Sequence, residues 1–439
     1  MSRILIMGYE LPSMAAGAIE ARSYRTWQFI EPLLADGHEV CLIVSHRDSQ
    51  LNLAHPLGPT LSYHRLNMQK RGWRSRINQV HGSFKPDAVL AIMFNNCLRA
   101  VRIASKQPLW MDLYGDKLAE TQVAEHTLNS NRGRRVMLQY LQTVLNGGDV
   151  YSTCGTPQMN ALIGQLGMAS RLNRHTLGYQ FVHPVLPGAP TKPQNVKDGP
   201  VLRGNLVADE AFIVMWCGGY NVWTDVDTLF QALNQAMSRN PQIAFVSVGA
   251  GVKFARHNTY ERFLAMIESS PYRQRFHMLG WRPASEIPNL YRQADVGINL
   301  DAFHYETLLG TRTRLVEMMS YGLPVITSLG CELSAIIQNQ ALGLTFPIGD
   351  SEALCDRILT LTGNPIARRK LAEQAQQYAT QQLSFAETTR PFREWAHQPH
   401  HAPDRLQKRA RYDPREIEYF LRSVLRGVLW QLWALERGE

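Results

Sequence analysis

Residues 295–328, DVGINLDAFHYETLLGTRTRLVEMMSYGLPVITS, contain the pattern that decides the fold. A short apolar run, typical of a buried strand, ends at Asp301. Gly310 then opens an amphipathic helical pattern that Gly322 ends, and the next apolar run begins at Pro324. Strand, loop, helix and strand in this order predict a parallel βαβ unit, with a ligand site at the carboxyl end of its first strand.

The same alternation continues on both sides of this stretch, with helical patterns between short apolar runs. The predicted strands are 3–8, 38–45, 60–66, 87–93, 108–112 and 149–154 in the first half, and 212–217, 243–248, 276–280, 296–300, 324–327 and 343–347 in the second. A chain of 439 residues is too long for one ordinary core. We therefore predict an α/β protein with two Rossmann-like, doubly wound parallel-sheet domains that face each other across a cleft.

A stretch rich in proline and glycine separates the two halves and predicts a linker. The predicted divisions are a first domain 1–185, a linker 186–209, a second domain 210–385 and a basic tail with an amphipathic helix 386–439.

Composition excludes several classes of protein. No run of 18 apolar residues predicts a transmembrane helix, and the first apolar run is too short for a signal peptide. The six cysteines form no CxxC pair, which indicates reduced core residues in a cytoplasmic protein. The net charge of +9 favours anionic ligands or surfaces. Nucleic acid is disfavoured, because no basic patch is interleaved with aromatic residues in the two domains.

Charged side chains gather on the helix that Gly310 opens. Arg312 and Arg314 lie in its first turn, where cations oppose the helix dipole unless an anion faces them. Glu317 lies about 9 Å along the axis from Thr311, at roughly 1.5 Å per residue. A carboxylate there can accept both hydroxyls of a ribose. We therefore predict that these five residues bind a nucleotide; the alternative is a surface helix with an ordinary Arg/Glu pair.

Glycine turns follow three predicted strands. Such turns let backbone N–H groups approach a phosphate, although a single one is as easily a tight turn without a ligand. None of the three is a GxGxxG or Walker sequence, so a dehydrogenase or kinase is disfavoured. The predicted phosphate-binding turns include Gly17, Gly218, Gly219 and Tyr220.

The order of these features resembles the nucleotide-binding domain of the large group 1 family of retaining glycosyltransferases, which have the GT-B architecture. The matching segments are FHMLGWRPASEIPNLYRQADVGINLD at 276–301, LVEMMSYGLPVIT at 315–327 and GLTFPIGD at 343–350. The resemblance covers residues 210–385, whereas the first half matches in layout alone, with Gly17 in the acceptor-side loop. It implies transfer of a sugar, of the hexosyltransferase class, from a nucleotide diphosphate sugar, without a metal ion or other cofactor.

The resemblance also implies roles for single residues. Glu317 matches the ribose-binding second glutamate of the family's paired motif. The first, which lies near the donor sugar, is usually eight positions earlier; here the nearest acid is Glu306, eleven earlier. The family's lysine after the glycine turn is missing, so its role passes to Arg312, Arg314 or Lys253. The base-binding turn contains Trp281 and Arg282.

Asp112, after the strand 108–112, would face the cleft and orient a hydroxyl of the acceptor or donor. The alternative is an Asp that caps the next helix. A metal site is disfavoured, because the one DxD sequence, at Asp225 and Asp227, falls in a helix start. The acceptor stays open between a glycan, a lipid-linked molecule and a small molecule. A nucleotide-sugar epimerase, a glycosyl phosphorylase and a non-catalytic nucleotide-binding module remain alternatives, since fold does not fix function.

Residues 413–439 follow a basic stretch and repeat apolar residues at helical spacing. We expect this helix to pack on the protein itself or on a second subunit in a dimer. The alternative is peripheral contact with the inner face of the membrane, given its tryptophans and the basic residues before it.

Overall fold

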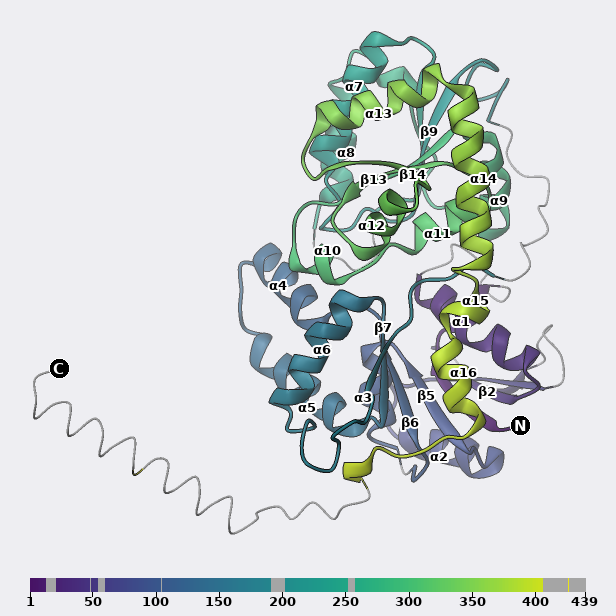
Figure 1. Cartoon of the computed structure of the whole chain (residues 1–439), viewed down its shortest axis with the longest axis vertical. Helices are drawn as coiled ribbons and strands as arrows, with labels where there is room; N and C mark the ends of the chain where they lie inside the picture. The colour runs from purple at the N-terminus through teal and green to yellow at the C-terminus, as the bar shows by residue number, and fades with distance from the viewer. Residues whose placement is uncertain are drawn as a thin grey trace, which may run out of the picture.

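The computed structural model describes residues 1–12, 21–47, 49–53, 60–103, 105–190, 202–251, 257–405 and residue 425. Within them the chain forms two α/β domains stacked along the long axis of the molecule, each built on one twisted sheet (Figure 1). The predicted fold class is confirmed. Gly17, Lys253 and all of the predicted C-terminal helix except Leu425 lie outside the described residues.

The first sheet has the strand order β3-β4-β2-β1-β5-β6-β7-β8. Its strands are β1 (Arg3–Gly8), β2 (Glu39–Ser45), β3 (Gln50–Leu53), β4 (Leu61–Leu66), β5 (Ala88–Ile92), β6 (Leu109–Leu113), β7 (Val150–Thr153) and β8 (Val182–Pro184). All neighbours pair in parallel except β3, which is antiparallel to β4. The edge strands β3 and β8 are the two that the apolar pattern does not predict, since both are short.

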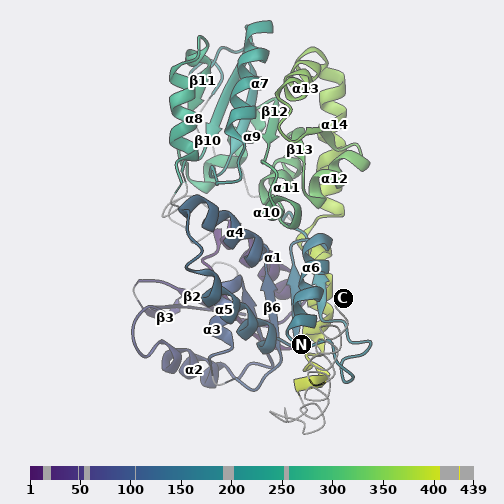
Figure 2. The ribbon, with the colours of Figure 1, turned by 90° about the vertical axis from the view of Figure 1, so that its left-hand side faces the viewer.

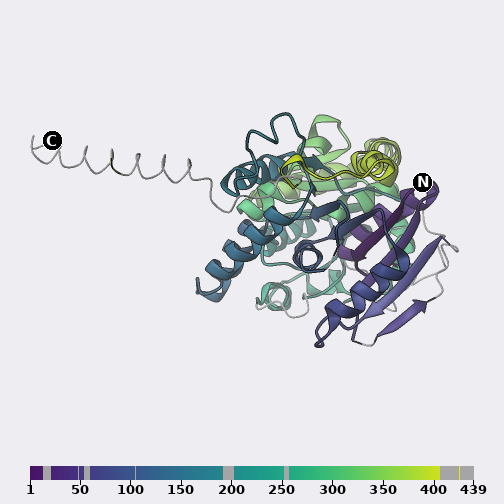
Figure 3. The ribbon, with the colours of Figure 1, turned by 90° about the horizontal axis from the view of Figure 1, so that it is seen from below.

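Helices cover both faces of this sheet, so its central strands are apolar throughout. Side chains of β1 alternate between two cores, with Leu5 on one face and Ile4 on the other. The helices are α1 (Ala21–Ala35), α2 (Trp73–Phe84), α3 (Phe94–Ala100), α4 (Lys117–Leu128), α5 (Arg134–Gly147) and α6 (Thr156–Met168). Figure 3, seen from below, and Figure 1 agree that α4 and α5 lie on the side of this domain away from the N terminus.

The second sheet is parallel, with the order β11-β10-β9-β12-β13-β14. Its strands are β9 (Phe212–Cys217), β10 (Ile243–Val248), β11 (Phe276–Met278), β12 (Val296–Asn299), β13 (Val325–Leu329) and β14 (Gly343–Pro347). The strand order reverses between β9 and β12, which is where a doubly wound sheet binds its ligand.

The helices of this domain are α7 (Val226–Arg239), α8 (Thr259–Glu268), α9 (Ile287–Gln293), α10 (Tyr305–Leu309), α11 (Thr313–Ser320), α12 (Glu332–Asn339), α13 (Ser351–Gly363) and α14 (Pro365–Gln381). Helix α10 falls within the segment that the sequence predicts as a loop.

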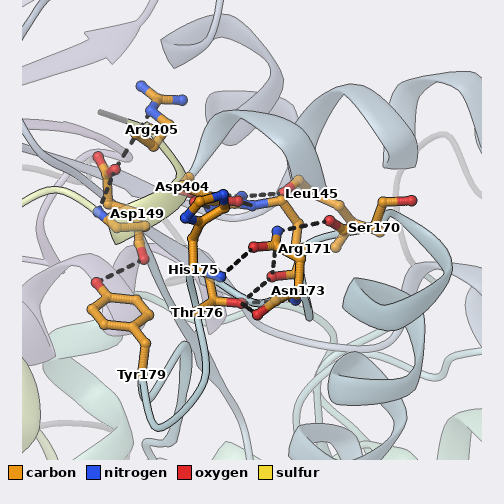
Figure 4. A network of polar contacts seen from close by, with 12 residues as sticks. Leu145, Asp149, Ser170, Arg171, Asn173, His175, Thr176, Tyr179, Asp404 and Arg405 are labelled. Atoms are coloured by element: carbon orange, nitrogen blue, oxygen red, sulfur yellow. Dashed lines mark hydrogen bonds and ion pairs between the residues drawn. The ribbon is translucent and has the colours of Figure 1, made fainter. Parts of the chain in front are cut away.

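After α14 the chain returns to the first domain through α15 (Phe385–Thr388) and α16 (Arg390–His397). Phe392 and Trp395 of α16 pack on Trp110 of β6, with ring centroids 5.2 and 5.5 Å away. Asp404 then pairs with the buried Arg171, which also donates to the Leu145 carbonyl at 2.6 Å (Figure 4). The predicted tail up to Arg405 is therefore fastened to the first domain.

Candidate functional site

Three turns of the second domain meet at the carboxyl ends of β9, β10 and β11. The Gly218 amide donates to the Val248 carbonyl at 2.7 Å, and the Gly249 amide donates to the Gly280 carbonyl at 2.7 Å. Gly249 has φ +130°, and a Cβ there would lie 2.1 Å from the Gly218 oxygen. The turns thus require glycine for their own packing, so the glycines alone do not show that a phosphate binds.

Arg314 projects from α11 toward the first of these turns. Its Nη2 donates to the Gly219 carbonyl at 3.1 Å, and its guanidinium carbon lies 4.1 Å from the centre of the Trp216 ring. No carboxylate oxygen of the described residues lies within 4.0 Å of it, and Nη1 is buried with no hydrogen-bond partner there. Burial lowers the pKa of Arg314, and the neighbouring cation Arg312 adds to this effect. A cation in this position is suited to an anionic ligand.

Glu317 lies one turn further along α11, and it is partly buried. Its Oε2 accepts a hydrogen bond from Tyr291 Oη at 3.2 Å. Burial raises the pKa of Glu317 to about 7, although Tyr291 and Arg314 act in the opposite direction. The predicted partners Arg314 and Glu317 are therefore brought to the same end of the sheet, with Tyr291, which the sequence analysis missed, as a support.

Arg312 and Glu306 form a separate buried ion-pair cluster. Arg312 Nη2 lies 2.9 Å from Glu306 Oε2, and Arg312 Nε lies 2.8 Å from Asp301 Oδ2. Burial alone would lower the pKa of Arg312, but the two carboxylates outweigh it and raise that pKa. The charge of Glu306, the predicted catalytic residue, is thus paired with that of Arg312 inside the protein. Next to them, the Thr311 hydroxyl is buried without a hydrogen-bond partner among the described residues.

The other predicted nucleotide ligands are placed differently. The ring of Tyr220 is fully buried and stacks on Trp216, so it supports the turn from below. Trp281 is exposed beside Gly251, whose carbonyl accepts from its indole at 3.4 Å. Arg282 pairs with Glu286 at 2.8 Å. Of these side chains, Trp281 is the one placed to stack on a base.

Asp112 is buried inside the first domain, and its side chain has no exposed surface. Its two oxygens accept from Arg25 at 3.0 and 2.7 Å, and Ser152 donates to it at 2.6 Å. Arg25 also donates to the Val185 carbonyl at 2.9 Å, where the chain leaves the domain. The surroundings of Asp112 are those of a buried structural ion pair, because its oxygens face protein groups.

Neither carboxylate of the DxD sequence is free to bind a metal ion. Asp225 caps α7 by accepting from the Thr228 amide at 3.0 Å, and Asp227 pairs with Arg262 at 2.7 Å. Elsewhere in the described residues, Asp36, His38 and His397 have the spacing of metal ligands, but the Asp36 carboxylate pairs with Arg393 at 2.6 Å. That cluster lies in the first domain, whereas the predicted nucleotide ligands of α11 lie in the second.

A cavity of about 1090 Å³ lies between the two domains. It is lined by Gln122, Val123, His126 and Thr127 of α4, and by Val222, His257, Asn258, Thr259, Arg262, Phe303, His304 and Tyr305 of the second domain. A second cavity, of about 440 Å³, lies between α4, α5 and α10 and shares Gln122 and Tyr305 with the first. These cavities provide space for an acceptor.

Hydrogen bonds join the two domains beside the cleft. Tyr114 Oη and Thr313 Oγ1 lie 2.6 Å apart, and Glu332 accepts from the Thr156 amide at 2.6 Å. Thr313 stands between Arg312 and Arg314, so the first domain contacts the helix of the predicted donor site directly. The sequence carries no signal for these pairs, because each joins residues of different halves.

Within the described part of the chain, no helix has the length and apolarity to cross a bilayer.

Comparison with known proteins agrees with this architecture. Residues 211–364 match the family model of the "Glycosyl transferases group 1". No curated protein sequence matches the chain. The fold is similar to that of sucrose-phosphate synthase from Thermosynechococcus elongatus, with a TM-score of 0.69 and 16% identity over 91% of this chain and 99% of that one.

Two further structures are similar. Anabaena HepE in complex with UDP-glucose has a TM-score of 0.65 and 16% identity over 90% of this chain and 99% of that one. WaaG, a glycosyltransferase involved in lipopolysaccharide biosynthesis, has a TM-score of 0.59 and 15% identity over 88% and 98%.

Proposed function

We propose that this chain, whose second domain belongs to the group 1 glycosyltransferases, transfers a hexose from a UDP-sugar to an acceptor, with retention of configuration and without a metal ion. The observation that carries the proposal is Arg314, a cation at the strand-order reversal of the second sheet that no carboxylate of the described residues pairs with. The presence of UDP-glucose in the similar HepE structure supports UDP as the nucleotide.

The diphosphate lies against Arg314 and the turn at Gly218 and Gly219. The sequence after β9, GGYNVWTDVDTL, has no lysine or arginine, so a cation from α11 takes the place of the family's lysine. Arg312 cannot do this while Asp301 and Glu306 hold it. Arg314 Nη1 and the Thr311 hydroxyl, which have no hydrogen-bond partner in the described part of the chain, supply donors to phosphate oxygens.

The nucleoside lies along the same edge. Glu317 accepts from the ribose hydroxyls, with Tyr291 holding one of its oxygens in position. Trp281 offers an exposed ring for the base. These contacts are made equally before and during transfer, so they set affinity for the donor.

Catalysis follows from stabilising the departing diphosphate. As the bond from the sugar to the phosphate oxygen breaks, positive charge grows on the sugar ring and negative charge on UDP. Arg314 and the Thr311 hydroxyl stabilise that negative charge as hydrogen-bond donors. The acceptor hydroxyl approaches from the cavity between the domains, attacks the same face of the sugar and gives its proton to the departing phosphate oxygen.

Incubation with UDP-sugars and a mixed pool of acceptors tests the function. Transfer predicts acceptor-dependent release of UDP together with a glycosylated product. An epimerase would instead return an isomeric nucleotide sugar, and a binding module would leave the UDP-sugar intact. A thermal-shift screen of nucleoside diphosphates identifies the base, because a ligand at 100 times its Kd stabilises the protein by about 2.7 kcal/mol.

A further inference from the structure

Exposed apolar side chains gather where the two domains meet, at the opening of the cleft. Phe303, Tyr305 and Leu308 of the second domain are 68%, 58% and 43% exposed, and Leu138 of α5 is 47% exposed. Tyr305 and Leu138 line the same 440 Å³ cavity. We call these four residues the cleft rim; Figure 2 shows α4, α5 and α10 together on the side that faces the viewer.

The side chains of the rim on α10 are exposed because of the way this short helix packs. Glu306 and Thr307 turn inward, Glu306 to pair with Arg312 and Thr307 to donate to the Ala302 carbonyl at 2.9 Å. On a helix this leaves Tyr305 and Leu308, three residues apart, together on the outer side. Large apolar side chains held outward in this way beside a cavity indicate a surface that contacts another partner.

The charge next to the rim is positive. Arg132 and Arg135, at the start of α5, are exposed, and no carboxylate oxygen of the described residues lies within 4.0 Å of either. Arg134 between them is paired with Glu125 at 2.6 Å. Exposed arginines beside exposed leucine and aromatic side chains suit a surface that is both apolar and anionic.

The last described residues of the chain contact the C-terminal end of α5. Arg405 donates to the Gly147 carbonyl at the end of α5, and Asp404 is held by Arg171 (Figure 4). The residues that follow include Lys408, Arg409 and Arg411 in the sequence. In the sequence, the described tail is thus followed by a further basic stretch.

We infer that the cleft rim, with Arg132 and Arg135, docks on an anionic lipid surface, and that the acceptor is carried by that lipid surface. The apolar part of the acceptor stays in the bilayer, while its polar group enters the cavity between α4 and α10. The second statement rests on the proposed glycosyl transfer, whereas the docking does not.

Flotation of the full chain with vesicles tests the docking. The wild type floats with vesicles of phosphatidylcholine that contain phosphatidylglycerol, and much less with phosphatidylcholine alone. Arg132→Ala with Arg135→Ala weakens this binding about thirtyfold, since each basic residue near an anionic surface accounts for about fivefold. Arg273→Ala, which removes an exposed arginine of the second domain, leaves it unchanged.

The apolar half of the rim is tested with a matched control. Phe303→Ser and Leu138→Ser each weaken vesicle binding by about tenfold, as expected when one large apolar side chain no longer leaves water. Ile366→Ser, at an 83% exposed position on α14, binds like the wild type. Circular dichroism checks that all variants are folded.

Several results would overturn the inference. One is equal binding of the wild type to both kinds of vesicle; another is rim variants that float as well as the wild type. A wild-type dimer that Phe303→Ser dissociates without lipid would assign the rim to a second copy of the chain. Donor turnover is measured separately on UDP-sugar without vesicles, so a failure of docking leaves the proposed function standing, and loss of turnover alone leaves docking standing.

Discussion

Replacing Arg314 with glutamine tests whether this cation binds a ligand or stabilises the fold. Among the described residues, Arg314 has a single hydrogen-bond acceptor, the Gly219 carbonyl, and its burial disfavours the charge that it carries. Glutamine removes the charge and keeps a polar side chain. We therefore expect the unliganded variant to be as stable as the wild type, or slightly more so, because the substitution removes a cation that pairs with no carboxylate of the described residues.

Binding of UDP should change in the opposite direction. A hydrogen bond to a charged group contributes about 1.5–3 kcal/mol, which corresponds to roughly ten- to hundredfold in Kd. Isothermal titration with UDP measures the loss, and differential scanning calorimetry of the same samples measures the stability.

Arg312→Gln is the matched control, two residues away. It leaves Asp301 and Glu306 buried without their cation, and breaking such a pair costs about 3–5 kcal/mol. For a domain of this size that lowers Tm by about 6–20 °C. The reasoning is refuted if Arg314→Gln binds UDP like the wild type, or if it is destabilised as much as Arg312→Gln.

Four further predictions concern the same site. Donor affinity should rise as pH increases through about 7, because burial holds the Glu317 carboxyl protonated below that value; Glu317→Gln should remove this pH dependence, as measured by UDP titration between pH 6 and pH 8. The same shift means that the unliganded protein loses stability as pH rises from the usual value of 4.5 toward 7, since the folded state binds more protons there, and Glu317→Gln should abolish that loss in thermal melts. Glu306→Gln should slow transfer and also lower Tm, because it removes half of the charge that holds Arg312; slower turnover at an unchanged Tm would instead show that Glu306 acts on the sugar alone. Turnover should survive EDTA, and activity that EDTA abolishes and Mg²⁺ or Mn²⁺ restores would contradict the metal-free mechanism.

The length of the loop before α11 affects both the predicted donor site and the cleft rim. The spacing of eleven between Glu306 and Glu317 leaves room for α10, which the sequence does not predict because it is only five residues long. The same short helix buries Glu306 against Arg312 and turns Tyr305 and Leu308 outward. One local change in the chain thus affects both the donor site and the surface around the cleft.

The sequence by itself determined every strand of the two sheets except β3 and β8, and it predicted where the candidate donor site lies. Strands and helices have periodicities of about 2 and 3.6 residues, so apolar runs and amphipathic patterns show them locally. Glycine turns at strand ends are equally local, and the resemblance to a family then assigned Glu317 to the ribose. The spacing of Leu315, Val316 and Met319 also predicted the buried face of the helix that positions Glu317, and all three side chains are buried.

Only the tertiary structure decided which charged residues are available to a ligand. Arg312 and Arg314 are equivalent in sequence, but the fold places Asp301 and Glu306 around the first and a glycine turn against the second. In the sequence, Asp112 at the end of a strand is a candidate to bind a ligand. In the fold, Arg25, 87 positions away, pairs with it. Charge pairing depends on distances between residues remote in the chain, and no local pattern contains those distances.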